Sequence, residues 1–277
     1  MKTIIPFCLT LIILIGSAGV SKSADFKKGE NALKKRDFAT AVKEWGPLVD
    51  RGHDRAERGY GDIARLAKDY KGALKFYTRS AKKGNARAQY QLGSLYSKGK
   101  GVPKDIKTAI KWWTLAAEQP LKSIERVEMT YQPLIQYLVA TYYLGGEGIP
   151  QDYKTALKYF RMAAKQGNAD SQVSLGNMYA KGRGVPQDYK TALKWYKLAA
   201  EQGNAIAQIS LGLMYGNGQG VIQDNVYAHM WFNIAASSGK ETASKSRDIV
   251  AKRMTPADIS AAQKLARECV RKNYKGC

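Results

Sequence analysis

The sequence contains few of the residues that perform most catalytic and metal chemistry. It has two histidines and three cysteines among 277 residues. Neither His53 nor His229 has a second histidine or a cysteine at a metal spacing such as i+4, so packing or surface positions are expected for both. There is no GxSxG motif and no cysteine–histidine nucleophile arrangement. We therefore expect no metal, no cofactor and no enzyme activity.

Acidic residues are also scarce, with 23 Asp and Glu against 45 Lys and Arg, which gives a net charge of +22. The few carboxylates are scattered, so the paired acids of a glycosidase cannot be assigned. The glycine-rich stretch at residues 93–101 is not a phosphate-binding P-loop, because no Ser or Thr follows Lys100. The excess of positive charge favours acidic partners.

Long apolar runs are absent except near the N-terminus. Lys2 precedes an apolar run at residues 4–15, and small residues follow it. This pattern predicts a signal peptide at residues 1–24, because the run is too short to span a bilayer comfortably. An uncleaved anchor is the alternative. The mature chain would be periplasmic or secreted, with a charge of +20 once Lys2 and Lys22 are removed. Export argues against nucleic acid and favours anionic lipid head groups, cell-wall polymers or acidic proteins.

Only two cysteines remain after such cleavage, Cys269 and Cys277. An even pair in an oxidising compartment predicts a disulfide. Its short loop would contribute about 2–3 kcal/mol at most, by holding the tail against the last helix. A reactive or metal-binding pair is the alternative, but no histidine or carboxylate cluster accompanies it.

A repeat dominates what is present. Two stretches of nineteen residues begin at Gln151 and Gln187, and they differ at only five positions. Aspartates that start similar segments are spaced by 32, 36, 47, 36 and 36 residues, and they are Asp37, Asp69, Asp105, Asp152, Asp188 and Asp224. A GxG pair recurs in the later repeats. The 47-residue step contains an insertion of 11 near residues 120–130.

Each repeat contains two helical stretches with apolar faces. Pro186 lies in the turn between them, and Gly203-Asn204 is expected to end the second helix. Small alanine pairs allow close helix contact, and Gly176 and Gly212 are expected where the two helices approach most closely. Such a hairpin cannot bury its apolar face alone, so stacking is required. The sequence therefore predicts an all-α fold, a right-handed α-solenoid of helical hairpins.

The Leu-Gly, GxGV, Asp-x-x-x-Ala and Ala-Ala-x-x-Gly-Asn elements recur in order, and they resemble the Sel1-like repeat, a relative of the tetratricopeptide repeat. The third clear repeat departs from it, with Val139-Ala140 in place of Leu-Gly. We predict tetratricopeptide-like hairpins at 25–85, Sel1-like repeats at 86–240, and capping helices with a tail at 241–277. Thr255 is an expected N-cap, with Pro256 at the first helical position.

The resemblance implies a scaffold that binds a protein or peptide partner in the groove lined by one helix of each hairpin. Carried over by position, the groove residues are Arg87, Tyr90, Ser94, Lys98, Tyr137, Thr141, Val173, Asn177, Lys181, Ile209, Leu213 and Asn217.

Two other interpretations stay open. Lysines recur four residues apart on successive second helices and would form a basic stripe. This stripe either meets an anionic envelope surface or is simply solvated. Its members are Lys107, Lys111, Lys154, Lys158, Lys190 and Lys194. A hydrolase of cell-wall-like substrates, or a relative of the cysteine-rich β-lactamase-like Sel1 proteins, is the third hypothesis. The chain has neither a nucleophile for such a reaction nor the cysteine pair that those proteins carry in each repeat. The sequence does not specify the partner or the oligomeric state.

Overall fold

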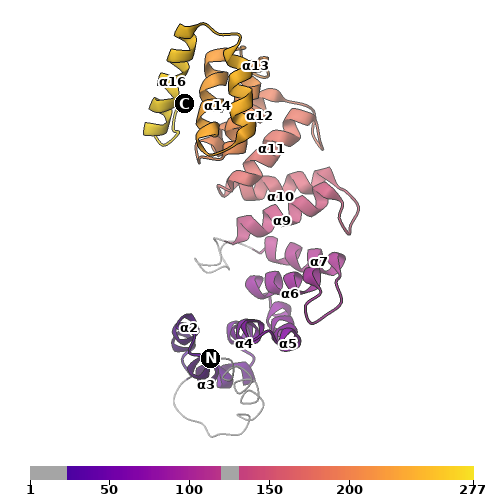
Figure 1. The fold of residues 1–277 in the computed structure, drawn as a ribbon. Helices are drawn as coiled ribbons and strands as arrows, with labels where there is room; N and C mark the ends of the chain where they lie inside the picture. The colour runs from indigo at the N-terminus through magenta and orange to yellow at the C-terminus, as the bar shows by residue number, and fades with distance from the viewer. Residues whose placement is uncertain (1–23, 120–130) are drawn as a thin grey trace. The chain divides into compact units, whose positions relative to one another are not determined.

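The computed structural model describes residues 24–119 and 131–277, and all of its regular elements in these ranges are helices (Figure 1). They are α2 (Phe26–Lys34), α3 (Phe38–Asp50), α4 (Asp54–Leu66), α5 (Tyr70–Lys82), α6 (Ala86–Lys98), α7 (Ile106–Ala117), α9 (Gln132–Gly145), α10 (Tyr153–Lys165), α11 (Ala169–Lys181), α12 (Tyr189–Ala200), α13 (Ala205–Asn217), α14 (Asn225–Ser237), α15 (Glu241–Ala251) and α16 (Pro256–Arg271). The predicted all-α fold class is confirmed. The predicted signal peptide at 1–24, apart from its last residue, and the insertion at 120–130 lie outside the described residues.

The helices pack as consecutive hairpins within two compact units. The first unit runs to Ile135 and includes Glu147–Ile149, and the second comprises Gln136–Gly146 and Pro150–Cys277. In the first unit α2 packs on α3, α4 on α5 and α6 on α7; in the second, α11 packs on α12 and α13 on α14. Second helices also contact the first helix of the next hairpin, as α3 contacts α4, α5 contacts α6, α10 contacts α11 and α12 contacts α13. This is the stacked-hairpin arrangement expected of a solenoid.

A glycine in the first helix of a hairpin faces an aromatic ring from the second. A Cβ added at Gly212 would lie 2.6 Å from Cε1 of Phe232, and one at Gly93 would lie 2.6 Å from Nε1 of Trp113. Gly176 faces Tyr196 in the same way. The expected close approach at Gly176 and Gly212 is therefore confirmed. In the third repeat, where Ala140 replaces glycine, its Cβ fits and the residue is fully buried.

The repeated aspartates begin the second helices. The side chain of Asp188, for example, accepts a hydrogen bond from the backbone N–H of Thr191, which satisfies one of the unpaired donors at the start of α12. The Thr191 hydroxyl also donates to this carboxylate at 2.6 Å. Hydrogen bonds from the Thr191 side chain and backbone lower the pKa of Asp188 below its usual value.

The two residues of the Gly-Asn pair have different structural roles. Gly203 has a φ of 81° and makes the turn after α12. Asn204, which we expected to end that helix, instead has an extended conformation and caps the start of α13. Its side-chain oxygen accepts from the backbone N–H groups of Ile206 and Ala207. An Asn side chain that bonds to the next turn is better satisfied as an N-cap than as a helix end.

Buried glutamines join neighbouring hairpins. The amide of Gln172 donates to the carbonyl of Ala164 at the end of the preceding helix, and its oxygen accepts from Gln202 at 2.8 Å. Gln136 accepts from Gln166 in the equivalent way. These bonds satisfy helix-end carbonyls that would otherwise be buried without partners.

The C-terminal helix begins as predicted. Thr255 caps α16 and forms a capping box with Asp258, and Pro256 occupies the first helical position. Both α15 and α16 pack on α14, which closes the second unit at its C-terminal end.

The glycine–aromatic contact can be tested within α13. Gly212→Ala should lower the free energy of unfolding by about 1–3 kcal/mol, because the new methyl overlaps Phe232. Gly216→Ala is the matched control, since its Cβ would meet Ala228 at an ordinary 3.6 Å; it should be neutral or stabilise by up to about 1 kcal/mol. Urea unfolding measures both, and equal effects would contradict the assignment.

Candidate partner-binding surface

The predicted groove residues all lie on first helices, namely α6, α9, α11 and α13. Lys98, Asn177, Lys181, Leu213 and Asn217 are exposed, and most of the others are half-buried. Val173 differs, because it is only 6% exposed and belongs to the core of the second unit. Its side chain packs between hairpins and is not available to a ligand.

Several of the polar groove residues are already hydrogen-bonded within the chain. The hydroxyl of Ser94 donates to the carbonyl of Tyr90, and that of Thr141 donates to Leu138. The amide oxygen of Asn177 accepts from the Tyr196 hydroxyl at 2.8 Å. These three side chains therefore stabilise their own helices or hairpins, whereas the tyrosines, the cations and the apolar residues are better placed to contact a partner.

In the first unit, Arg87 and Tyr90 border a pocket. It has a volume of about 90 Å³ and is lined by α6, the end of α7 and the start of α9. Ala86, Gln91, Ala116, Tyr131, Gln132 and Ile135 complete its walls. Its surface is mostly apolar, and Tyr131 at its edge is 49% exposed. A small apolar pocket with a few polar groups is the usual form of an anchor site.

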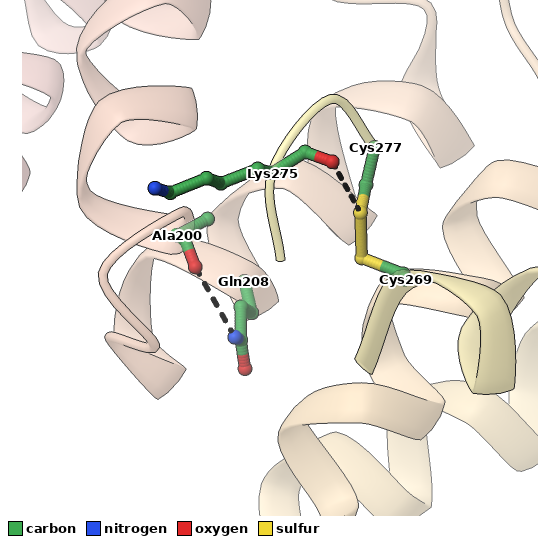
Figure 2. Close-up of a disulfide and its surroundings, with 5 residues drawn as sticks. All are labelled: Ala200, Gln208, Cys269, Lys275 and Cys277. Carbon is green, nitrogen blue, oxygen red and sulfur yellow. Dashed lines mark hydrogen bonds between the residues drawn. A yellow bond between two sulfur atoms is a disulfide. The ribbon is translucent and has the colours of Figure 1, made fainter. Parts of the chain in front are cut away.

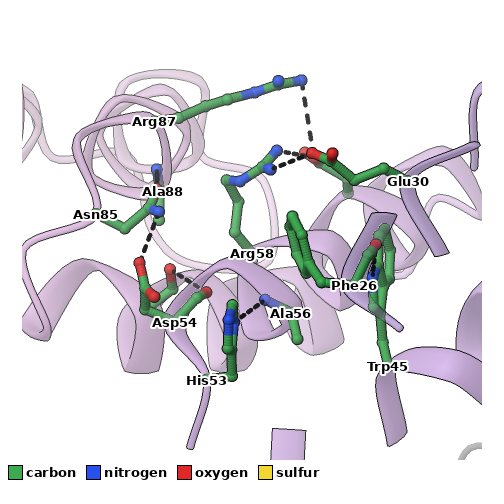
Figure 3. A network of polar contacts seen from close by, with 12 residues as sticks. Phe26, Glu30, Trp45, His53, Asp54, Ala56, Arg58, Asn85, Arg87 and Ala88 are labelled. Carbon is green, nitrogen blue, oxygen red and sulfur yellow. Dashed lines mark hydrogen bonds and ion pairs between the residues drawn. The ribbon is translucent and has the colours of Figure 1, made fainter. Parts of the chain in front are cut away.

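A charged network lies beside this pocket on α4. The carboxylate of Asp62 accepts hydrogen bonds from Arg58 at 3.1 Å and from the Tyr77 hydroxyl at 2.8 Å. Arg87 approaches the same carboxylate at 3.8 Å, and Arg58 approaches Glu30 at 3.8 Å. Figure 3 shows Arg58 and Arg87 converging on this side of α4, next to Glu30. Burial, and then the charge of Asp62, raise the pKa of Tyr77 well above its usual value.

This network was not predicted from the sequence. Asp62 and Arg58 are buried, and Glu57 is completely buried, where it pairs with Arg79 and Lys83 at 2.8 Å each. Charged residues are rarely fully buried unless they are paired. The spacing of Arg58 and Asp62, four residues apart on one helix, was the signal that could have revealed the pair.

In the second unit the corresponding surface on α13 is apolar. Ile206 is 54% exposed and Leu213 is 47% exposed, and half-buried Ile209 lies between them. Residues three and four apart share a helix face, so these side chains form a short apolar stripe with Asn217 at its end.

The six lysines of the predicted stripe lie on α7, α10 and α12, and each is exposed. They stand two per second helix, four residues apart. Some of them act on the N-capping aspartates: Lys111, Lys154 and Lys194 contribute to the lowered pKa values of Asp105, Asp152 and Asp188. The stripe is therefore solvated and accessible within each unit.

The comparisons with known proteins agree with this geometry. The Sel1 repeat model matches residues 56–85, 86–121, 134–168, 169–204 and 205–240, which is more than half of the chain. The chain belongs to the Sel1-repeat family. Sel1-repeat proteins are generally non-enzymatic scaffolds that bind other proteins. No curated protein matches the chain.

A solved Sel1 repeat structure shows the same fold. A Sel1 repeat protein from Oxalobacter formigenes is 25% identical with a TM-score of 0.70, over 88% of this chain and 99% of the other. A protective antigen of uropathogenic Escherichia coli strains that displays an SLR fold is 22% identical with a TM-score of 0.43, over 90% and 69% of the two chains.

Neither histidine of this Sel1-repeat chain lies in a metal-binding arrangement. His53 caps α4, with its Nδ1 accepting from the backbone N–H of Ala56, and its ring stacks on Phe26 (Figure 3). His229 is buried on α14. In the described ranges, no group of three histidine, cysteine, aspartate or glutamate side chains is placed to hold a metal ion.

No helix in those ranges is long and apolar enough to cross a membrane.

His229 makes the stability of the last Sel1 repeat depend on pH. Burial, and then the nearby Arg247 guanidinium, lower the pKa of His229 below 6.5. The unfolded chain therefore binds a proton first, so the contribution of His229 to stability is complete above about pH 6.5 and is lost as pH falls through the folded-state pKa. His229→Gln should flatten this part of the curve of unfolding free energy against pH. An unchanged slope below pH 6.5 in the variant would contradict the assignment.

Proposed function

We propose that the chain is an exported, non-enzymatic scaffold whose first helices bind a segment of a partner protein. The observation that supports this most directly is the apolar pocket bordered by Arg87 and Tyr90, since it lies on the helices that the repeat pattern nominates for binding. The signal-peptide pattern at residues 1–24 supports export. N-terminal sequencing of the mature protein would test that part.

The pocket favours a particular kind of partner. Its volume of about 90 Å³ suits one aliphatic side chain, and aromatic and aliphatic walls surround it. Arg87 stands at the pocket with its side chain 37% exposed and pairs only distantly with Asp62. Together with the net charge of +22, this favours an acidic segment that places one large apolar residue in the pocket.

Partner binding should depend on Tyr131 and not on its neighbour Leu134. Both residues are 49% exposed near the start of α9, but only Tyr131 lines the pocket. Tyr131→Ala should weaken binding about tenfold or more, as expected for an aromatic anchor contact, whereas Leu134→Ala should have little effect. The mature protein would be incubated with envelope and periplasmic extracts, and the retained partner would be titrated against each variant.

The second part of the test measures how partner binding depends on salt and on the charge at Arg87. Arg87→Glu should weaken binding of the same partner, and the effect should shrink between about 0.1 M and about 1 M NaCl, because salt screens exposed charges. Equal binding by the Tyr131→Ala and Leu134→Ala variants would remove the pocket from the proposal. Retention only of lipid or cell-wall material would instead favour the lysine stripe.

The exposed lysines support a second candidate function, which is binding to an anionic envelope surface. They repeat on α7, α10 and α12 at the same position of each hairpin, and each cation near an anionic membrane contributes about 1 kcal/mol.

This candidate is tested with vesicles of phosphatidylglycerol and phosphatidylethanolamine. Replacing Lys154, Lys158, Lys190 and Lys194 with serine should abolish binding, and replacing the same four with arginine should preserve it, since only the charge matters. Loss in both sets, or in neither, would contradict a role for charge on this surface.

A further inference from the structure

The tail after α16 folds back onto the last two Sel1 repeats. A disulfide joins Cys269 near the end of α16 to Cys277, with 5.6 Å between their Cα atoms. Cys269 is only 3% exposed and belongs to the core of the second unit. Figure 2 shows the disulfide and Lys275 next to Ala200 and Gln208, at the end of α12 and the start of α13. The ring that this disulfide closes, residues 269–277, therefore lies against the end of α12 and the start of α13 as well as α16.

Tyr274 is the residue of the ring that makes this contact. A Cβ added at Gly203, in the turn between α12 and α13, would lie 3.3 Å from Cε2 of the Tyr274 ring. Tyr274 also packs against the core of the second unit. Its backbone is left-handed, with φ values of 50° at Asn273 and 65° at Tyr274. Asn tolerates this conformation at a helix end, where local backbone hydrogen bonds close the turn, but a bulky residue such as Tyr274 rarely adopts it.

Apart from this ring, α16 buries little apolar surface against the rest of the second unit. The fully buried residues of α16 are Ala262, Ala266 and Cys269, which are all small, and Leu265 is only partly buried against the core. Small side chains remove little apolar surface from water. On α14, against which α16 packs, Nδ1 of His229 and Nε1 of Trp231 are buried without a hydrogen-bond partner in the described ranges. An interface of this kind gains stability from a covalent link.

The last repeat also lacks the glutamine bond that joins earlier hairpins. Gln202 donates to Gln172 at 2.8 Å, but thirty-six residues later Ser238 replaces the donor. The corresponding acceptor, Oε1 of Gln208, is buried and unpaired among the described residues. The tail lies next to Gln208 (Figure 2), in the region where that bond is missing.

We propose that the Cys269–Cys277 disulfide is a redox-sensitive latch that holds Tyr274 on the α12–α13 turn and thereby secures α16 and the last Sel1 repeat. The reductant is a dithiol, either a small molecule or a protein. Its thiolate attacks Sγ of Cys277, the less buried sulfur, and releases the Cys269 thiolate. The second thiol of the reductant then displaces Cys277, so the chain gains two electrons and two protons while the dithiol becomes a disulfide.

Reduction removes the covalent link that supplements the hydrogen bonds of the left-handed turn, in which the backbone N–H groups of Asn273 and Tyr274 donate to the carbonyls of Val270 and Cys269. Asn273 and Tyr274 can then relax to ordinary backbone conformations, and the Tyr274 ring leaves Gly203. The turn at residues 201–204 and the start of α13 are then exposed to solvent.

Hydrogen exchange of the full-length mature protein tests the latch, with and without dithiothreitol as the dithiol. Reduction should raise exchange at residues 201–208 and 272–277 roughly tenfold, with no change at residues 56–85, and reoxidation should reverse it. Tyr274→Ala in the oxidised protein should reproduce the rise at 201–208 with the disulfide intact. Lys272→Ala, at an exposed position of the same ring, is the matched control and should leave 201–208 unchanged.

The outcomes distinguish a disulfide that secures the α12–α13 turn from one that only closes its own loop. If reduction changes only residues 269–277, or if Tyr274→Ala leaves 201–208 protected, the proposal is overturned. The double variant Cys269→Ser with Cys277→Ser should behave like the reduced protein. Because dithiothreitol acts on the folded wild-type chain, poor folding of the double variant would not affect the main comparison.

Discussion

The contact between a glycine of one helix and an aromatic ring of the next sets the geometry of the hairpins that begin with α6, α11 and α13. Gly93 faces Trp113, Gly176 faces Tyr196 and Gly212 faces Phe232. Because a side chain at the glycine would displace the ring, the two helices can approach closely only while the position stays small. The hairpin then presents a second apolar face, which the next hairpin covers, and stacking follows from that need for burial.

Polar residues at the helix ends determine how the hairpins join. Aspartates begin the second helices, asparagines begin most first helices in the repeats, and buried glutamines bond the end of one hairpin to the start of the next. These side chains satisfy backbone groups that stacking would otherwise bury without partners. Their recurrence every 36 residues in the regular repeats is therefore a structural requirement, and the variable positions between them are free to carry binding function.

The sequence was sufficient to predict features that depend on one hairpin and its periodicity. The all-α fold, the close approach at Gly176 and Gly212 and the N-cap at Thr255 are of this kind. Features that depend on several helices were not predictable in the same way. Val173 was assigned to the groove, but packing between hairpins buries it. The pocket requires α6, α7 and α9 together, and the network around Asp62 requires carboxylates and cations from three helices.

The end of the lysine stripe shows how the last repeat is adapted to its position. Lys190 and Lys194 on α12 are exposed, but Val226 and Met230 occupy the same positions on α14. Met230 is only 1% exposed, because α15 and α16 pack on α14 where earlier second helices face solvent. A lysine there would bury an unpaired charge. The exchange of lysine for apolar residues therefore marks the repeat that receives the cap, and it explains why the charged surface and the disulfide-closed tail occupy different parts of the second unit.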